Sequence, residues 1–71
     1  MNIIEAMTLV RDGKKVRRPV WPVGDWVVRG ELSPTQMFYS FINPFDNCRG
    51  CALWWVRLDS LLAEDWEELS D

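Results

Sequence analysis

The sequence carries little of the chemistry that catalysis needs. It contains no histidine, which removes the commonest general base and the commonest metal ligand. Nucleophilic pairs of the Ser–His or Cys–His type are therefore impossible. Asp59, Glu64 and Asp65 are clustered, but paired carboxylates of the glycosidase kind must converge across a cleft, and 71 residues leave little room for one. An acidic segment is more often a solvated face, so we expect no enzyme activity.

Cys48 and Cys51 form a Cys-x-x-Cys motif, which would supply half of a four-thiolate zinc site. No second pair follows it, and a redox role would place the motif at a helix start beside a βαβ unit. We therefore interpret the two residues as ordinary reduced cysteines near a tight turn. A zinc ion shared between two subunits is the alternative. We expect the chain to need no metal and no cofactor.

Arginines and tryptophans offer a different chemistry, which is the binding of a small anion that carries a base. Nucleobases stack on exposed aromatic rings, with about 1–3 kcal/mol per base, and arginines donate paired hydrogen bonds to phosphate oxygens. Arg17, Arg18 and Trp21 supply both elements within five residues. The alternative is that tryptophan fills the core, and we expect this for three of the five tryptophans. The five are Trp21, Trp26, Trp54, Trp55 and Trp66.

The charges are unevenly distributed along the chain. The net charge of −3 is unfavourable for binding a nucleic acid polymer. Residues 11–18 hold five basic side chains and one acid, whereas residues 59–71 hold six acids and no base. Either the two segments lie side by side and neutralise each other, or the basic segment receives a small anionic ligand. Both arrangements can hold at once.

Capping signals predict an N-terminal helix from Asn2 to Asp12. Asn2 is a favourable N-cap, Glu5 completes a capping box, and Gly13 is placed to end the helix. Runs of β-forming residues then predict strands over residues 15–21, 26–31, 36–42, 51–58 and 65–69, with a short helical turn over residues 61–64 that Ser60 caps. Trp54 and Trp55 are adjacent on the fourth of these strands, so they should point to opposite faces.

These elements predict an α+β fold. The N-terminal helix packs on a small antiparallel sheet of about four to five strands, with the helical turn near the C-terminus, and residues 1–71 form one domain. A core of this size supplies only about 3–5 kcal/mol and usually needs further support. With at most one disulfide available, we expect a homo-oligomer. No basic and apolar leader and no long apolar run are present, so the expected location is the cytoplasm, with no membrane contact.

Two segments of the chain resemble one known family. Gly13-Lys14-Lys15-Val16-Arg17-Arg18, followed by Trp21, is similar to the opening of the second type of Thoeris anti-defence domain. Leu61-Leu62-Ala63-Glu64-Asp65-Trp66 is similar to the ending of that family. The resemblance implies a phage or prophage protein in the bacterial host cytoplasm. Such a protein binds a cyclic nucleotide immune signal, of the glycocyclic ADP-ribose type or a cyclic dinucleotide, and does not cleave it. The resemblance also implies a dimer or tetramer with pockets between subunits.

The chain departs from the family at two places. Trp21-Pro22-Val23 stands where the family often has Trp-Asn-Gly, and Arg57 replaces a serine, so Arg57 is expected to supply a different contact with an anion. The predicted ligand-binding residues are Arg17, Arg18, Trp21, Trp54, Arg57, Asp59, Ser60 and Asp65. The alternative function is a small acidic phage protein that inhibits a host protein by direct contact, with tryptophans as interface anchors.

Overall fold

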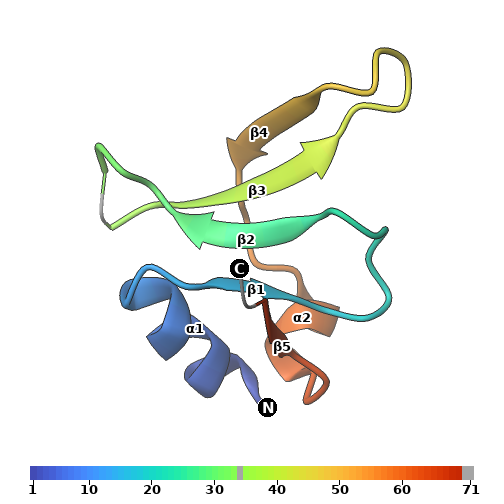
Figure 1. Cartoon of the computed structure of the whole chain (residues 1–71). Coiled ribbons are helices and arrows are strands. Elements are labelled where there is room, and N and C mark those ends of the chain that lie inside the picture. Colours follow the sequence, from blue (N-terminus) through green and yellow to red (C-terminus); the bar gives the residue numbers. More distant parts are fainter. Residues whose placement is uncertain (34, 70–71) are drawn as a thin grey trace.

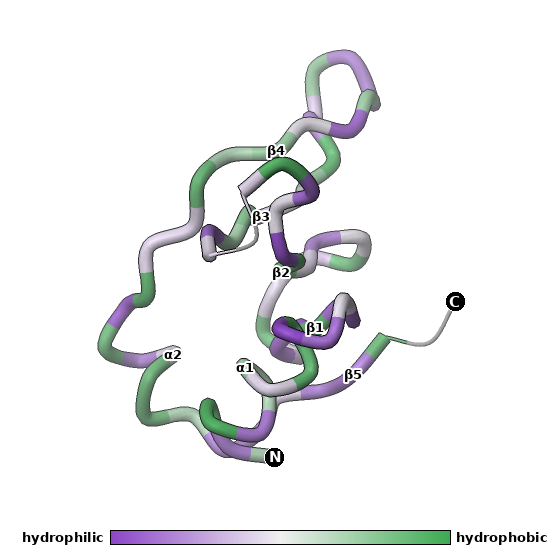
Figure 2. The backbone as a smooth tube through the Cα atoms, turned by 90° about the vertical axis from the view of Figure 1, so that its left-hand side faces the viewer, coloured by the Kyte–Doolittle hydropathy of each residue, from purple (hydrophilic) through white to green (hydrophobic). Residues whose placement is uncertain are grey.

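Two helices pack on one face of a five-stranded antiparallel sheet in the computed structural model, which describes residues 1–33 and 35–69. The elements in chain order are α1 (Ile3–Arg11), β1 (Lys15–Arg17), β2 (Trp26–Arg29), β3 (Met37–Ile42), β4 (Arg49–Leu53), α2 (Leu58–Leu62) and β5 (Glu67–Leu69). The strand order is β4-β3-β2-β1-β5 (Figure 1). In the perpendicular view of Figure 2, both helices lie to one side of the stacked strands. The α+β prediction is confirmed.

The N-terminal helix forms as its capping signals predict. The Asn2 side chain accepts a hydrogen bond from the Glu5 backbone N–H at 2.9 Å, and the Glu5 carboxylate accepts one from the Asn2 backbone N–H at 3.2 Å. The chain reverses just after the helix at Gly13, whose φ of 85° is a conformation that glycine adopts without strain. The helix buries Ala6 and Val10 against the sheet.

The first predicted strand is too long at its C-terminal end. β1 stops at Arg17 because it pairs with β2 on one side and with β5 on the other, and proline cannot donate to a ladder between two strands. Pro19 and Pro22 therefore lie in the connection to β2. The second, third and last strands fall within their predicted ranges.

The prediction for residues 51–64 is wrong in three respects. β4 begins at Arg49 and ends at Leu53, so Trp54 and Trp55 do not alternate on a strand. α2 begins at Leu58 rather than at residue 61 and has Arg57 as its N-cap, with no side-chain capping bond. Ser60 lies inside α2 instead of capping it. The hairpin closes earlier than expected because the Asn43 backbone N–H bonds to the Cys48 carbonyl at 2.8 Å.

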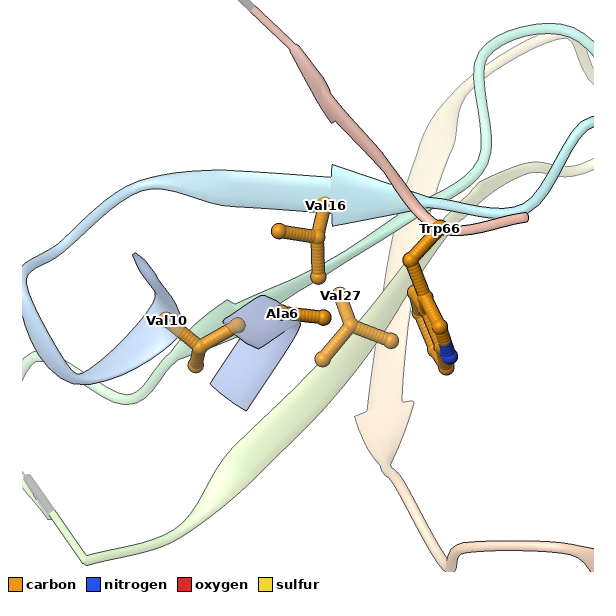
Figure 3. Close-up of a cluster of buried hydrophobic side chains, with 5 residues drawn as sticks. All are labelled: Ala6, Val10, Val16, Val27 and Trp66. Carbon is orange, nitrogen blue, oxygen red and sulfur yellow. The ribbon is translucent and has the colours of Figure 1, made fainter. Parts of the chain in front are cut away.

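The core lies between α1 and the sheet and is small. Figure 3 shows Val16 of β1 and Val27 of β2, which are paired across the strands, next to Ala6 and Val10 of α1. The Trp66 ring packs beside them, and each of these five side chains is 2 % exposed or less. The opposite face of the sheet, which carries Trp26 and Val28 of β2, has no helix over it in the described part of the chain.

We expect Val27→Ala to lower the free energy of unfolding by roughly 2 kcal/mol, because it deletes two buried methyl groups and leaves a cavity. A loss of that size is about half of what a core of this length provides. Val28→Ala is the matched control on the half-buried opposite face, and it should cost less. Urea unfolding curves measure both variants, and equal losses would contradict the position of the core.

Candidate functional site

Arg18 joins the basic segment to the acidic one. Its Nε donates to Asp65 Oδ1 at 3.0 Å, and its Nη1 lies 3.5 Å from Asp59 Oδ2. The Arg18 side chain is 12 % exposed, although it follows β1 directly. The approach has a backbone cause, because β5 pairs with β1 in a register that sets Arg17 opposite Glu67. Of the two interpretations of the charged segments, the one in which they lie side by side is confirmed.

The charges in this cluster influence each other's titration. The hydrogen bond from Arg18 lowers the pKa of the Asp65 carboxyl below its ordinary value of 3.8. The bond with Asp65 in turn raises the pKa of the Arg18 guanidinium. Arg57 extends the network, since its Nε lies 3.5 Å from Asp59 Oδ1, with both side chains mostly exposed. The carboxylates thus offset the arginines, and the cluster is not simply a cationic patch.

Two arginine nitrogens in this region have unused capacity to donate. Arg17 Nε and Arg18 Nη1 are buried and make no hydrogen bond within the described residues. Arg17 does use another nitrogen, because its Nη2 donates to the Trp21 carbonyl at 2.9 Å. Buried donors normally find a partner. An acceptor on a ligand would satisfy these two nitrogens once the side chains that cover them move aside.

Trp21, whose carbonyl accepts the hydrogen bond from Arg17, lies in a cluster of edge-to-face rings with Trp54 and Trp66. Trp21 is 6.4 Å from Trp54 and 5.3 Å from Trp66 between ring centroids, and Trp54 is 5.9 Å from Trp66. Trp66 is fully enclosed, and its indole N–H donates to the Ser60 carbonyl at 3.1 Å. Trp21 and Trp54 are only partly buried. They can therefore offer ring surface to a ligand while Trp66 fixes their positions.

The structure brings most of the predicted ligand-binding residues into one region. Arg18, Asp59 and Asp65 are in direct contact, Arg57 contacts Asp59, and Trp21 contacts Trp54. Arg17 is tied to this group through the Trp21 carbonyl. Ser60 is different, because it is 2 % exposed and its carbonyl is used by Trp66.

A buried acid beside the cluster was not singled out from the sequence. Asp25 is 7 % exposed and accepts a hydrogen bond of 2.7 Å from the Tyr39 hydroxyl. The Tyr39 ring packs edge-on against Trp21, with 5.1 Å between centroids. Burial and the bond to Asp25 raise the pKa of Tyr39 above its ordinary value of 10.0. The pair anchors the turn that carries Trp21. No signal in the sequence marks this pair, because it depends on the strand register, which sets Tyr39 opposite the core residue Val27.

A second feature missed from the sequence lies on the uncovered face of the sheet. The Arg49 guanidinium stacks on the Trp26 ring at 3.8 Å from the centroid, and the Lys15 ammonium lies 4.8 Å from the same ring. Arg49 also donates to the Ser40 hydroxyl at 2.8 Å. Beside these groups is an open groove of about 660 Å³, lined among others by Val28, Phe38 and Cys51.

The described residues show no group of three or more His, Cys, Asp or Glu side chains that could hold a metal ion. Cys48 and Cys51 are both free thiols and exposed. None of the helices in the described ranges is both long enough and apolar enough to cross a membrane.

The fold and this region define a small α+β protein whose polar cluster combines arginine donors, carboxylate acceptors and tryptophan rings. The chain belongs to the Tad2-like, or Thoeris anti-defense 2-like, domain family, whose sequence model matches residues 1–69. The match confirms the resemblance seen at the two ends of the chain and extends it through the middle. Comparison with curated protein sequences gave no significant match. Membership in this family points to a role in anti-defence.

We expect Asp65→Asn to remove part of the acid sensitivity of the fold. Because the pKa of Asp65 is lowered in the folded state, its stabilising effect is present above the ordinary value of 3.8 and is lost as the pH falls through the folded value. Unfolding free energies measured from neutral to acid pH should fall less steeply for Asp65→Asn than for the unaltered protein. Glu64→Gln, at the exposed neighbouring carboxylate, is the control and should retain the original slope.

Tyr39 gives a prediction at alkaline pH. Its folded pKa is raised, so the folded state retains the phenolic proton and stability falls as the pH rises above 10.0. Tyr39 is the single tyrosine of the chain, so phenolate absorbance reports on it directly. The midpoint should lie above 10.0 in the native protein, and urea or Asp25→Ala should move it down. A native midpoint at the ordinary value would contradict the buried hydrogen bond.

Proposed function

We propose that this protein binds a cyclic nucleotide immune signal, of the glycocyclic ADP-ribose type or a cyclic dinucleotide, and sequesters it without cleavage. It would act as a phage or prophage protein in the cytoplasm of the bacterial host. Family membership supports the anti-defence role. The observation that supports the binding role most directly is that two buried arginine nitrogens near Trp21, Arg17 Nε and Arg18 Nη1, make no hydrogen bond within the described residues.

Each part of such a signal has a chemical counterpart in the cluster. The two arginines and the exposed Arg57 can donate to phosphate oxygens. Asp59 and Asp65 can accept hydrogen bonds from ribose hydroxyls, because their side chains are 66 % and 44 % exposed. Trp21 and Trp54 supply flat ring surface for a base. A site that mixes donors with acceptors suits a nucleotide with ribose groups better than it suits a bare phosphate.

The absence of histidine from the sequence supports sequestration over hydrolysis. The carboxylates nearest the cluster are engaged by Arg18 and Arg57. The hydrogen bond from Arg18 lowers the pKa of the Asp65 carboxyl, which makes Asp65 a poor general acid near neutral pH. Ser60, the one serine among the predicted site residues, is buried inside α2.

We further propose that the protein works as a homo-oligomer, a dimer or a tetramer. α2 buries only Ser60 and leaves Leu58, Leu61 and Leu62 exposed to 72 %, 48 % and 70 %. Trp55, just before the helix, is 76 % exposed. Together these side chains form an apolar surface next to Arg57 and Asp59. A subunit that covered it would also enclose the binding cluster.

The same apolar surface favours a second candidate function, the inhibition of a host protein by direct contact. Tryptophan and leucine side chains on a small acidic protein would then anchor the host target. This candidate requires a stoichiometric complex with one host protein that Trp55→Ser weakens. It also requires that the purified protein show no affinity for nucleotides.

We expect the purified protein to show quenching of its tryptophan fluorescence when mixed with the matching cyclic nucleotide from a panel of glycocyclic ADP-ribose isomers and cyclic dinucleotides. Arg57→Ala should weaken that binding about tenfold, since a hydrogen bond to a charged group contributes roughly 1.5–3 kcal/mol. Arg11→Ala is the matched control, because Arg11 is also exposed and paired with a neighbouring acid, Asp12, but lies outside the cluster.

Denaturing the complex and identifying the released compound by mass spectrometry tests sequestration directly. The proposal expects the nucleotide to be recovered unaltered. Recovery of a linear or cleaved product would establish an enzyme instead. If no compound of the panel binds, the second candidate function becomes the better explanation.

A further inference from the structure

β4 has one paired edge and one free edge, and the backbone register determines which groups the free edge presents. Among residues 1–33 and 35–69, β4 is a terminal strand of the sheet and pairs with β3 alone (Figure 1). Hydrogen bonds to β3 bracket the ladder, from the Asn43 N–H to the Cys48 carbonyl at 2.8 Å and from the Trp54 N–H to the Met37 carbonyl at 2.9 Å. In an antiparallel ladder every second residue bonds to the neighbouring strand. The backbone N–H and C=O groups of Gly50 and Ala52 therefore point toward β3.

The intervening residues Arg49, Cys51 and Leu53 direct their backbone N–H and C=O groups away from the sheet. Such a row of unpaired groups is a template for another strand, and proteins usually protect it with charged side chains (lysine above all), proline, a bulge or a covering element. β4 contains no lysine, proline or acid, and its one charged residue, Arg49, directs its guanidinium to the Trp26 ring and the Ser40 hydroxyl. Cys51 and Ala52 are exposed, and Leu53 is 41 % exposed.

The opposite end of the sheet differs in its charge. β5 is the other terminal strand, and two of its three residues are Glu67 and Glu68, both exposed. If the β5 edges of two copies paired, carboxylates of like charge would come together, and their repulsion would oppose the pairing. At β4, the side chains between Arg49 and Leu53 are Gly50, Cys51 and Ala52. These small side chains let another backbone approach closely.

We infer that the free edge of β4 pairs antiparallel with the same edge of a second copy of this chain, with Cys51 at the two-fold axis. In this register, the outward-facing backbone N–H and C=O groups of one β4 lie opposite the complementary groups of the other β4. Arg49 lies opposite the partner's Leu53, Cys51 lies opposite the partner's Cys51, and each pair exchanges two backbone hydrogen bonds. No like charges oppose each other, because the single charged residue of β4 faces a leucine.

The pairing would have a structural consequence on the uncovered face of the sheet. Arg49, Gly50 and Cys51 line the open groove of about 660 Å³. Since β4 is at the dyad, the grooves of the two copies would adjoin there, and a single sheet would run through both copies. The inference rests on the homo-oligomer of the proposed function, for which it names a surface.

Cysteine cross-linking tests the register. Directly opposite residues of a hydrogen-bonded antiparallel pair have Cα atoms about 5.5 Å apart, within the range of about 4.4–6.8 Å that a disulfide spans. Under mild oxidation, Cys48→Ser, which leaves Cys51 as the only thiol, should form a covalent dimer whose yield does not fall on moderate dilution. Cys51→Ser, which leaves the equally exposed Cys48, is the control and should remain largely monomeric on a denaturing gel. Equal yields from the two variants would overturn the register.

Sedimentation equilibrium of Cys51→Lys tests the pairing itself. Two lysines would face each other at the dyad, and we expect the dissociation constant of the assembly to rise at least tenfold. Cys51→Ser should match the unaltered protein, and circular dichroism verifies that each variant is folded. If folded Cys51→Lys forms an assembly of unchanged mass, the β4 pairing is overturned, but the proposal of a homo-oligomer is not. If the unaltered protein is a monomer, both the β4 pairing and the homo-oligomer are overturned. Nucleotide binding, measured in the same samples, reports separately on the proposed function.

Discussion

The structure depends on the burial of Trp66, because this residue joins the end of the chain to its beginning. Its backbone N–H bonds to the Met1 carbonyl at 3.2 Å, and its indole N–H bonds to Ser60 at 3.1 Å. Its ring fills the space beside the valine core and contacts Trp21 and Trp54. With Trp66 in place, the next residues extend along β1 as β5. The acidic segment thereby comes beside the basic one, so the Arg18 cluster is a consequence of how the sheet closes.

That closure explains how a chain of net charge −3 could bind an anion selectively. Had the arginines been left without acids, they would form a general anion site with poor discrimination. Arg18 is instead held by Asp65 and Asp59, which fixes its geometry while one of its nitrogens keeps an unused donor. A bare phosphate would meet the neighbouring carboxylates and be repelled. A nucleotide with ribose hydroxyls would satisfy the same carboxylates, so the acids favour one class of anion over another.

The parts of this structure that could be predicted from the sequence are those set by neighbouring residues. The capping box of α1 and the turn at Gly13 are local, and the structure agrees with them within a residue. The region from β4 to α2 could not be predicted, because β4 ends where the Trp54 ring packs on Trp21 and Trp66, which are distant in the sequence. That the charged segments meet was one of the two interpretations that their composition allowed. The bond between Asp25 and Tyr39 depends on strand register, which a pattern of single residues does not contain.

The exposed apolar surface and the free strand edge have separate consequences for assembly. β4 and β5 are at opposite ends of the strand order, so a pair formed through β4 would leave the Arg18 cluster, beside β5, away from the dyad. The leucines of α2 and Trp55 border that cluster instead, as Arg57 and Asp59 belong to the same segment. A contact through α2 would therefore enclose the nucleotide, whereas a contact through β4 would extend the sheet. Two different isologous contacts on one chain close into a tetramer where their two-fold axes cross at right angles, and in such an assembly only the contact through α2 would be strengthened by a bound nucleotide.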